Sequence, residues 1–225
     1  MHQIYLKYQI GESMSGQTYN LAGLYGISDE KLTPFSTLIT QVQEAIAGGM
    51  KIFQFRDKNS LDKDIIEIIK HLMNICASSN VLFVLNDRIE LAIKLGVPGL
   101  HIGKDDGNLA SVRKRFEGIL GVSSYGDISR AKEAQSQGAD YVAFGAIFPS
   151  LTKPNAVCIG AEILAEAKAV LDIPICAIGG ISKDNIQLLK NADMSAVISY
   201  LWNGNPRQNA QNLAESFMRA KLAKY

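Results

Sequence analysis

Cysteine and histidine are scarce in this sequence, which has three residues of each type among 225. The cysteines Cys76, Cys158 and Cys176 lie far apart and form neither a Cys-x-x-Cys pair nor a zinc-finger spacing. The sequence therefore gives no sign of a disulfide framework or a structural zinc site. We expect three reduced thiols in a reducing compartment.

An excess of one charge and long apolar runs are also absent. Lys and Arg number 23 against 22 Asp and Glu, so no global field favours a nucleic acid or an anionic membrane. No stretch approaches the ~18 apolar residues of a membrane span, and residues 1–20 lack the apolar core of a signal peptide. We expect a cytoplasmic protein without nucleic-acid or membrane partners. A homo-oligomer stays open, because no heptad or unusually apolar helix face stands out.

The remaining composition is that of a globular protein, with 47% hydrophobic and 20% charged residues. A chain of this length suits one domain, since α/β barrels reach ~250 residues as a single unit. Residues 1–20 are polar and interrupted by Gly and Ser. We expect them to form a tail or extension, and residues 21–225 to form one catalytic domain.

Short apolar runs alternate with longer segments of helical periodicity, which is typical of a parallel sheet with crossover helices. The predicted strands are Leu21–Ser28, Lys51–Arg56, Val81–Leu85, Gly99–Ile102, Ile119–Ser123, Tyr141–Ile147, Ile175–Ile178 and Ala196–Tyr200. Predicted helices include Phe35–Ala47, Leu61–Ala77, Ile128–Gln137, Ala161–Leu171 and Pro206–Leu222, with Ser60 and Ser182 as N-caps and Gly48 and Gly138 as C-terminal stops. No Gly-x-Gly-x-x-Gly turn follows the first strand, so a closed (β/α)8 TIM barrel is favoured over an open doubly wound sheet.

The second predicted strand ends in alternating polar and aromatic residues. Gln54, Arg56 and Lys58 share one face, and Phe53 and Phe55 share the other. Because helices cover the outside of a barrel, the polar face is expected to point through the barrel mouth, where barrel enzymes have their active sites. A solvated edge strand is the alternative.

Carboxylates follow the third and fourth predicted strands. Asp87 follows one strand, and Asp105 and Asp106 follow the next. Neighbouring carboxylates repel unless a cation lies between them, and Mg²⁺ is typically held by one or two carboxylates together with water and substrate phosphate. The alternative is that Asp105 or Asp106 caps the following helix and Asp87 pairs with Arg88.

Hydroxyl groups, a cation and glycines follow the last four predicted strands. Ser123, Thr152 and Lys153 suit an anion near the metal. Gly180 and Ser199 lie in the two loops that commonly bind phosphate in barrels, through backbone N–H groups and a helix N-terminus. Two anion sites across one mouth suggest two phosphorylated ends, which belong either to two substrates or to one bisphosphate.

Together, these motifs resemble the thiamine-phosphate synthase family, over nearly the whole barrel from Leu24 to Leu201. The matching motifs are Gln54–Lys58, Asn86–Arg88, His101–Asp106, Gly121–Ser123, Thr152–Lys153, Ile178–Ile181 and Ile198–Ser199. The resemblance implies a transferase that joins 4-amino-5-hydroxymethyl-2-methylpyrimidine diphosphate to 4-methyl-5-(2-phosphoethyl)thiazole. The products would be thiamine phosphate and diphosphate.

The resemblance also implies roles for individual residues. It implies that the pyrimidine diphosphate is bound by Gln54, Arg56, Lys58, Asn86, Ser123 and Lys153, and the thiazole phosphate half by Thr152, Gly180, Ile198 and Ser199. Asp87 and Asp106 would hold Mg²⁺, and Arg56, Lys58, Ser123 and Lys153 would act in catalysis. The implied mechanism is dissociative and needs no general base. We therefore expect His101 to be a packing or ring-contacting residue.

Some residues depart from the family pattern. Tyr125 stands where many members have His, Ser150 where Thr is usual, and Lys104 where Gln is common. Residues 191–195 replace the usual Gly-Ala-Asp-Gly. Three rival functions remain: a thiazole tautomerase, whose catalytic His would fall at Tyr125; an aldolase with a Schiff-base lysine; and a non-catalytic sensor of thiamine precursors.

Overall fold

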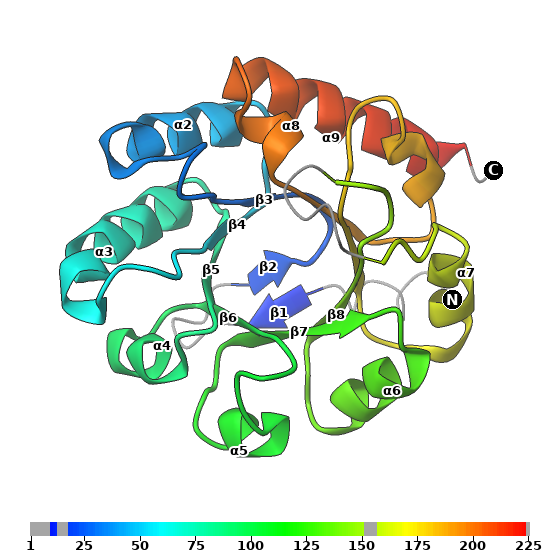
Figure 1. Cartoon of the computed structure of the whole chain (residues 1–225), viewed down its shortest axis with the longest axis horizontal. Helices are drawn as coiled ribbons and strands as arrows, with labels where there is room; N and C mark the ends of the chain where they lie inside the picture. Colours follow the sequence, from blue (N-terminus) through cyan, green and yellow to red (C-terminus); the bar gives the residue numbers. More distant parts are fainter. Residues whose placement is uncertain (1–9, 13–17, 151–156, 224–225) are drawn as a thin grey trace.

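The protein is a closed barrel of eight parallel strands surrounded by helices (Figure 1). The computed structural model describes residues 10–12, 18–150 and 157–223. The barrel strands are β3 (Gly23–Ile27), β4 (Ile52–Phe55), β5 (Leu82–Asn86), β6 (Gly99–Ile102), β7 (Ile119–Tyr125), β8 (Tyr141–Phe144), β9 (Ile175–Ile178) and β10 (Met194–Val197). The strands follow in chain order, and β10 pairs with β3 to close the ring. The predicted (β/α)8 barrel is confirmed.

The helices alternate with the strands and form the outer layer (Figure 1). They are α2 (Phe35–Ala47), α3 (Asp62–Ser78), α4 (Ile89–Leu95), α5 (Leu109–Arg113), α6 (Ile128–Ser136), α7 (Ile163–Val170), the 3₁₀ helix η1 (Ile186–Leu189), α8 (Ser199–Trp202) and α9 (Pro206–Leu222). Within the described ranges, none of these helices combines the length and the hydropathy needed to span a membrane.

The last barrel strand differs from its predicted position. The prediction was Ala196–Tyr200, whereas β10 spans Met194–Val197 and Ser199 already begins α8. Met194 pairs with Gly23 of β3, so the strand starts two residues before the predicted run. Short apolar runs do not distinguish a buried strand from a buried helical turn, and here one run includes parts of both.

The two predicted N-caps differ from expectation. Ser60 does not cap α3, because the N-cap position is Leu61, and the Ser60 hydroxyl donates to Asp57 Oδ2 over 2.8 Å. Ser182 precedes a turn and the short helix η1, and its hydroxyl accepts from the N–H of Asp184 over 3.2 Å. Gly48 is the C-cap of α2 but has a right-handed φ of −82°. Gly138 follows α6 with a φ of +92°, which is the left-handed conformation of a glycine stop.

The hydrophobic residues form two cores. The larger core lies between the strands and the surrounding helices. The smaller core fills the barrel interior and includes Tyr25, Leu82, Tyr141 and Met194. Alternation along each strand produces this division, since successive side chains point to opposite faces.

A short hairpin near the N-terminus packs against the inner core. Its strands β1 (Ile10–Glu12) and β2 (Thr18–Asn20) are antiparallel and lie across the barrel in Figure 1. Tyr19 is only 4% exposed and packs in the inner core with Leu21 and with Met194 at the start of β10. Thus Tyr19, which falls in the expected tail, contributes to the barrel at the end opposite the mouth.

Candidate active site

A cavity of about 710 Å³ opens at the carboxyl ends of the barrel strands and reaches into the barrel. All eight barrel strands contribute lining residues, which include the deep side chains of Tyr25, Cys176 and Ala196. The predicted site residues among them are Gln54, Arg56, Asn86, Ser123 and Ile198. The volume is in the range of small-molecule sites. Because β4 pairs with both β3 and β5, the alternative of a solvated edge strand is wrong.

A second cavity of about 250 Å³ adjoins the first and contains Gly180, Ile198 and Ser199. The two cavities share Ser150, Ile178, Gly179 and Ile198. Gly180 has a φ of +63°, and a Cβ atom there would overlap the carbonyl oxygen of Pro149. The lining of this cavity therefore requires glycine on steric grounds.

Two carboxylates and a lysine meet at the ends of β4, β5 and β6. Lys58 Nζ lies 3.2 Å from Asp87 Oδ2, and Asp106 Oδ2 accepts from the N–H of Gly103 over 2.6 Å. Burial raises the pKa of Asp106, as does its hydrogen bond with Asp87, while the Gly103 N–H and Lys58 oppose the rise. The two carboxylates therefore face each other.

Neither alternative for these aspartates holds. The cap of α5 is Asn108, whose side chain accepts from the N–H of Ser111. Arg88 pairs with Asp57 and Asp62, whereas Asp87 pairs with Lys58.

The pair of carboxylates fits a magnesium ion. In the described part of the chain there is no cluster of three or more His, Cys, Asp or Glu side chains suited to a metal. Two facing carboxylates nevertheless match the usual protein contribution to Mg²⁺, whose other ligands are water and substrate phosphate. Burial is the main cause of the raised pKa of Asp106, and the neighbouring Asp87 raises that pKa further.

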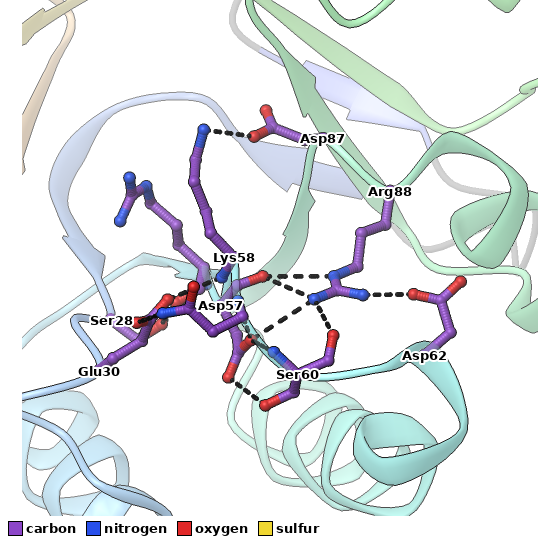
Figure 2. A network of polar contacts seen from close by, with 10 residues as sticks. Ser28, Glu30, Asp57, Lys58, Ser60, Asp62, Asp87 and Arg88 are labelled. Carbon is purple, nitrogen blue, oxygen red and sulfur yellow. Dashed lines mark hydrogen bonds and ion pairs between the residues drawn. The ribbon is translucent and has the colours of Figure 1, made fainter.

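Arg88 ties the loop after β4 to the end of β5 (Figure 2). Its Nη2 donates to the carbonyl oxygens of Asp57 and Ser60 over 2.8 and 2.7 Å, and its Nη1 pairs with Asp62. Asp57 in turn accepts from the N–H of Ser60 over 2.7 Å. Since Lys58 lies in this loop and Asp87 precedes Arg88, the network holds these two residues together.

The loop after β3 supports the same backbone from its other side (Figure 2). Ser28 Oγ accepts from the N–H of Arg56 over 2.7 Å, and Glu30 Oε1 accepts from the N–H of Lys58 over 2.7 Å. The backbone that carries both cations is therefore fixed by two neighbouring loops.

Below the mouth, five polar side chains are linked through the barrel interior. Gln54 Nε2 donates to the Tyr25 hydroxyl over 2.7 Å. The Tyr25 hydroxyl lies 2.9 Å from the Tyr141 hydroxyl. The Tyr141 hydroxyl lies 3.0 Å from His101 Nδ1, and His101 Nε2 lies 2.9 Å from Ser123 Oγ. Sequence reasoning missed both tyrosines. The available signal was a phenol within a buried strand, since a buried Tyr hydroxyl usually requires a partner.

His101 is buried within this set of side chains. Burial lowers the pKa of its imidazole to about 4, and the negative charge of Asp106 opposes the shift. The ring packs against Tyr141 with centroids 5.6 Å apart, and both ring nitrogens have hydrogen-bond partners. These contacts agree with the expected packing role.

Two predicted site residues and one departure from the family pattern remain to be placed. Thr152 and Lys153 lie outside the described residues. Tyr125 lines the large cavity, is 48% exposed, and accepts a hydrogen bond from the N–H of Lys104 over 3.4 Å. The position at which a tautomerase would require His therefore carries a phenol at the cavity wall.

Comparisons with known proteins agree with these features. A family model described as thiamine monophosphate synthase matches residues 24–201. The thiamine-phosphate synthase of Wolinella succinogenes is 46% identical over 207 residues, covering 89% of this chain and 96% of that protein. The protein of the same name from Acidithiobacillus ferrooxidans is 40% identical over 193 residues, covering 83% and 89%.

A solved structure gives the same result. The thiamine phosphate pyrophosphorylase of Pyrococcus furiosus superposes with a TM-score of 0.81 and 32% identity, covering 88% of this chain and 96% of that one. The family resemblance inferred from the strand-end motifs is thus confirmed. The chain belongs to the thiamine-phosphate synthase family.

Proposed function

We propose that this protein is a thiamine-phosphate synthase, a transferase of thiamine biosynthesis. It joins 4-amino-5-hydroxymethyl-2-methylpyrimidine diphosphate to 4-methyl-5-(2-phosphoethyl)thiazole and releases diphosphate and thiamine phosphate. Family membership supports this reaction. The structural observation that carries the proposal is a large, mainly apolar cavity with a few polar side chains in its wall, which adjoins a smaller glycine-containing cavity at one barrel mouth.

The large cavity is proposed to receive the pyrimidine diphosphate. Its walls carry Gln54, Arg56, Asn86 and Ser123, and Lys58 stands nearby on the same loop as Arg56. Lys153 is proposed for the same substrate from the family motif alone.

The smaller cavity is proposed to receive the phosphate of the thiazole. Gly180, Ile198 and Ser199 line it, and Gly180 lets the backbone approach an oxygen closely. Asn185 holds this loop in place, because its Nδ2 donates to the Gly180 carbonyl oxygen over 2.9 Å. Thr152 is assigned here from the motif alone.

Asp87 and Asp106 are proposed to hold Mg²⁺. When bound, the ion acts as a Lewis acid that neutralises charge on the leaving diphosphate. Arg56 and Lys58 add positive charge beside the same group, and Lys153 is proposed to do so as well. These charges favour departure of diphosphate more than binding of the intact substrate, which is the requirement for catalysis.

The chemistry needs orientation more than proton transfer. In the proposed dissociative course the bond to diphosphate breaks first, the aminopyrimidine stabilises the methylene cation, and the thiazole nitrogen captures it. That nitrogen already has a lone pair, so no general base is required. The hydrogen bonds at both ring nitrogens of His101 support this view, and the two adjoining cavities would hold the partners in line.

The direct test is product formation from the two purified precursors, with each precursor omitted in turn. We expect thiamine phosphate and diphosphate in equal amounts, and only when both precursors are present. Binding of the thiazole phosphate without product would contradict the proposal and favour a tautomerase-like or sensory role. A borohydride-trapped adduct with an aldehyde substrate would favour an aldolase.

A further inference from the structure

We propose that Tyr25, Tyr141 and His101 are positioning residues, which form a hydrogen-bond chain of fixed direction from Gln54 to Ser123. The chain crosses the barrel interior from β4 to β7 through contacts of 2.7, 2.9, 3.0 and 2.9 Å. It leaves the hydroxyl hydrogen of Ser123 directed to a ligand acceptor in the large cavity. The inference rests on the proposed function for the identity of that ligand.

The direction of the chain follows from counting hydrogens. Gln54 Nε2 donates to the Tyr25 oxygen, and either hydroxyl could donate in the contact between Tyr25 and Tyr141. We assign the Tyr25 hydrogen to the Tyr141 oxygen, because this direction gives every hydrogen of the chain an acceptor. Tyr141 accepts that bond and directs its own hydrogen to His101 Nδ1. Each step satisfies one donor and one acceptor, as buried polar groups require.

The tautomer of His101 is a consequence of this order. A nitrogen that accepts a hydrogen bond has no proton, so Nδ1 is unprotonated and the ring hydrogen is on Nε2. Nε2 then donates to Ser123 Oγ over 2.9 Å. Burial favours the same neutral imidazole, because it disfavours the charged form.

Ser123 is the end of the chain that faces the ligand. Its oxygen accepts from His101, so its own hydrogen is available to an acceptor in the cavity that Ser123 lines. Gln54, at the other end, lines the same cavity. In the opposite direction, the Ser123 hydrogen would point to His101, and only oxygen lone pairs would face the ligand. These lone pairs would repel an anionic or acceptor group.

The environment of the chain makes its direction persistent. Tyr25 is 1% exposed, Tyr141 0%, Gln54 3% and His101 8%. Water therefore has least access to the link between Tyr25 and Tyr141, and breaking that link leaves a buried hydroxyl unsatisfied.

The first test is the tautomer of His101, measured by ¹⁵N NMR of the imidazole at one pH near 7.5. The chain has three histidines, so His2→Gln and His71→Gln assign the spectrum of the full-length protein. We expect His101 to be neutral, with the hydrogen on Nε2. An Nδ1–H tautomer or an imidazolium would overturn the proposal, and this result does not depend on which reaction the protein catalyses.

The second test separates positioning from mere stability. Tyr25→Phe removes the link between Gln54 and Tyr141, and we expect mixed His101 tautomers and a kcat lower by about tenfold, corresponding to one weakened hydrogen bond, with KM nearly unchanged. Tyr19→Phe is the matched control. It alters a tyrosine of the same inner core, and we expect it to change neither property.

The third test asks whether the effect passes through Ser123. In a Ser123→Ala background, Tyr25→Phe should lower kcat no further, because the hydroxyl that the chain orients has been removed. An equal loss of kcat in both backgrounds would overturn the proposed route. An unchanged His101 tautomer in Tyr25→Phe would also overturn it.

Discussion

Arg88 donates two hydrogen bonds to the carbonyl oxygen of Asp57, from Nη2 over 2.8 Å and from Nε over 3.3 Å (Figure 2). This forked contact joins the end of β5 to the loop after β4, so it links the residue beside Asp87 to the residue beside Lys58. The ion pair of 3.2 Å between Lys58 and Asp87 is therefore supported by groups that do not touch the cavity themselves.

Arg88→Lys is predicted to loosen this loop while conserving the charge. Lysine lacks the planar fork of donors, so the bonds to the Asp57 and Ser60 carbonyls cannot all be kept. We expect the free energy of unfolding to fall by about 1–3 kcal/mol and kcat/KM for the pyrimidine diphosphate to fall by roughly tenfold or more. Urea denaturation and steady-state kinetics measure these effects.

Arg115→Lys is the matched control for that change. Arg115 pairs with Glu90 at the surface, with side chains 52% and 75% exposed. Neither the urea midpoint nor kcat/KM should move, since exposed ion pairs contribute little. If Arg88→Lys also left the urea midpoint and kcat/KM unchanged, the hydrogen bonds of Arg88 to the loop after β4 would have no functional importance.

Gly180→Ala is predicted to damage the smaller cavity. The added methyl group would overlap the Pro149 carbonyl oxygen, and the φ of +63° is unfavourable for alanine. We expect KM for the thiazole phosphate to rise by about tenfold or more, and KM for the pyrimidine diphosphate to change less.

Gly96→Ala provides the comparison at a similar φ of +61°. Among the described residues other than its chain neighbours and adjoining helix backbone, no atom lies within 4 Å of its added Cβ. This variant should show the backbone cost of roughly 1 kcal/mol in stability with unaltered kinetics. Equal kinetic effects at both positions would mean that the shape of the smaller cavity is unimportant.

Thiol labelling is predicted to select one cysteine of the folded protein. Burial raises the pKa of Cys76 to about 12 and also raises the pKa of Cys176, while Cys158 is exposed. At pH 8 the Cys76 thiol would therefore remain protonated and unreactive. An aromatic disulfide reagent should titrate one thiol per chain rapidly, and three in denaturant. Rapid reaction of two or more thiols in the folded protein would contradict this burial.

Much of the fold was predictable because its signals are local. The helices Phe35–Ala47 and Pro206–Leu222 begin and end where expected. Of the predicted polar face, Gln54 and Arg56 line the large cavity and Lys58 does not. Phe53 and Phe55 lie in the outer core, as the alternation predicts.

Other features depend on contacts between distant segments. Tyr25 and Tyr141 are 116 positions apart, and only the closed barrel brings their hydroxyls within 2.9 Å. Serine is a common N-cap residue, but the Ser60 hydroxyl donates to Asp57 instead. The ion pair of Lys58 with Asp87 could not be predicted either, because it depends on the relative positions of two loops, which no sequence motif specifies.

The most direct test of the proposed site is a magnesium titration of thiamine-phosphate formation with Asp87→Asn, Asp106→Asn and Asp105→Asn. Asp105 is the matched control, because it is exposed and adjoins Asp106 in sequence. We predict that wild type and Asp105→Asn form product with the same dependence on Mg²⁺. Asp87→Asn and Asp106→Asn should each need at least about tenfold more Mg²⁺ or lose activity. Full activity of these two variants at the wild-type Mg²⁺ concentration, or product formation in excess chelator, would contradict the proposed magnesium site.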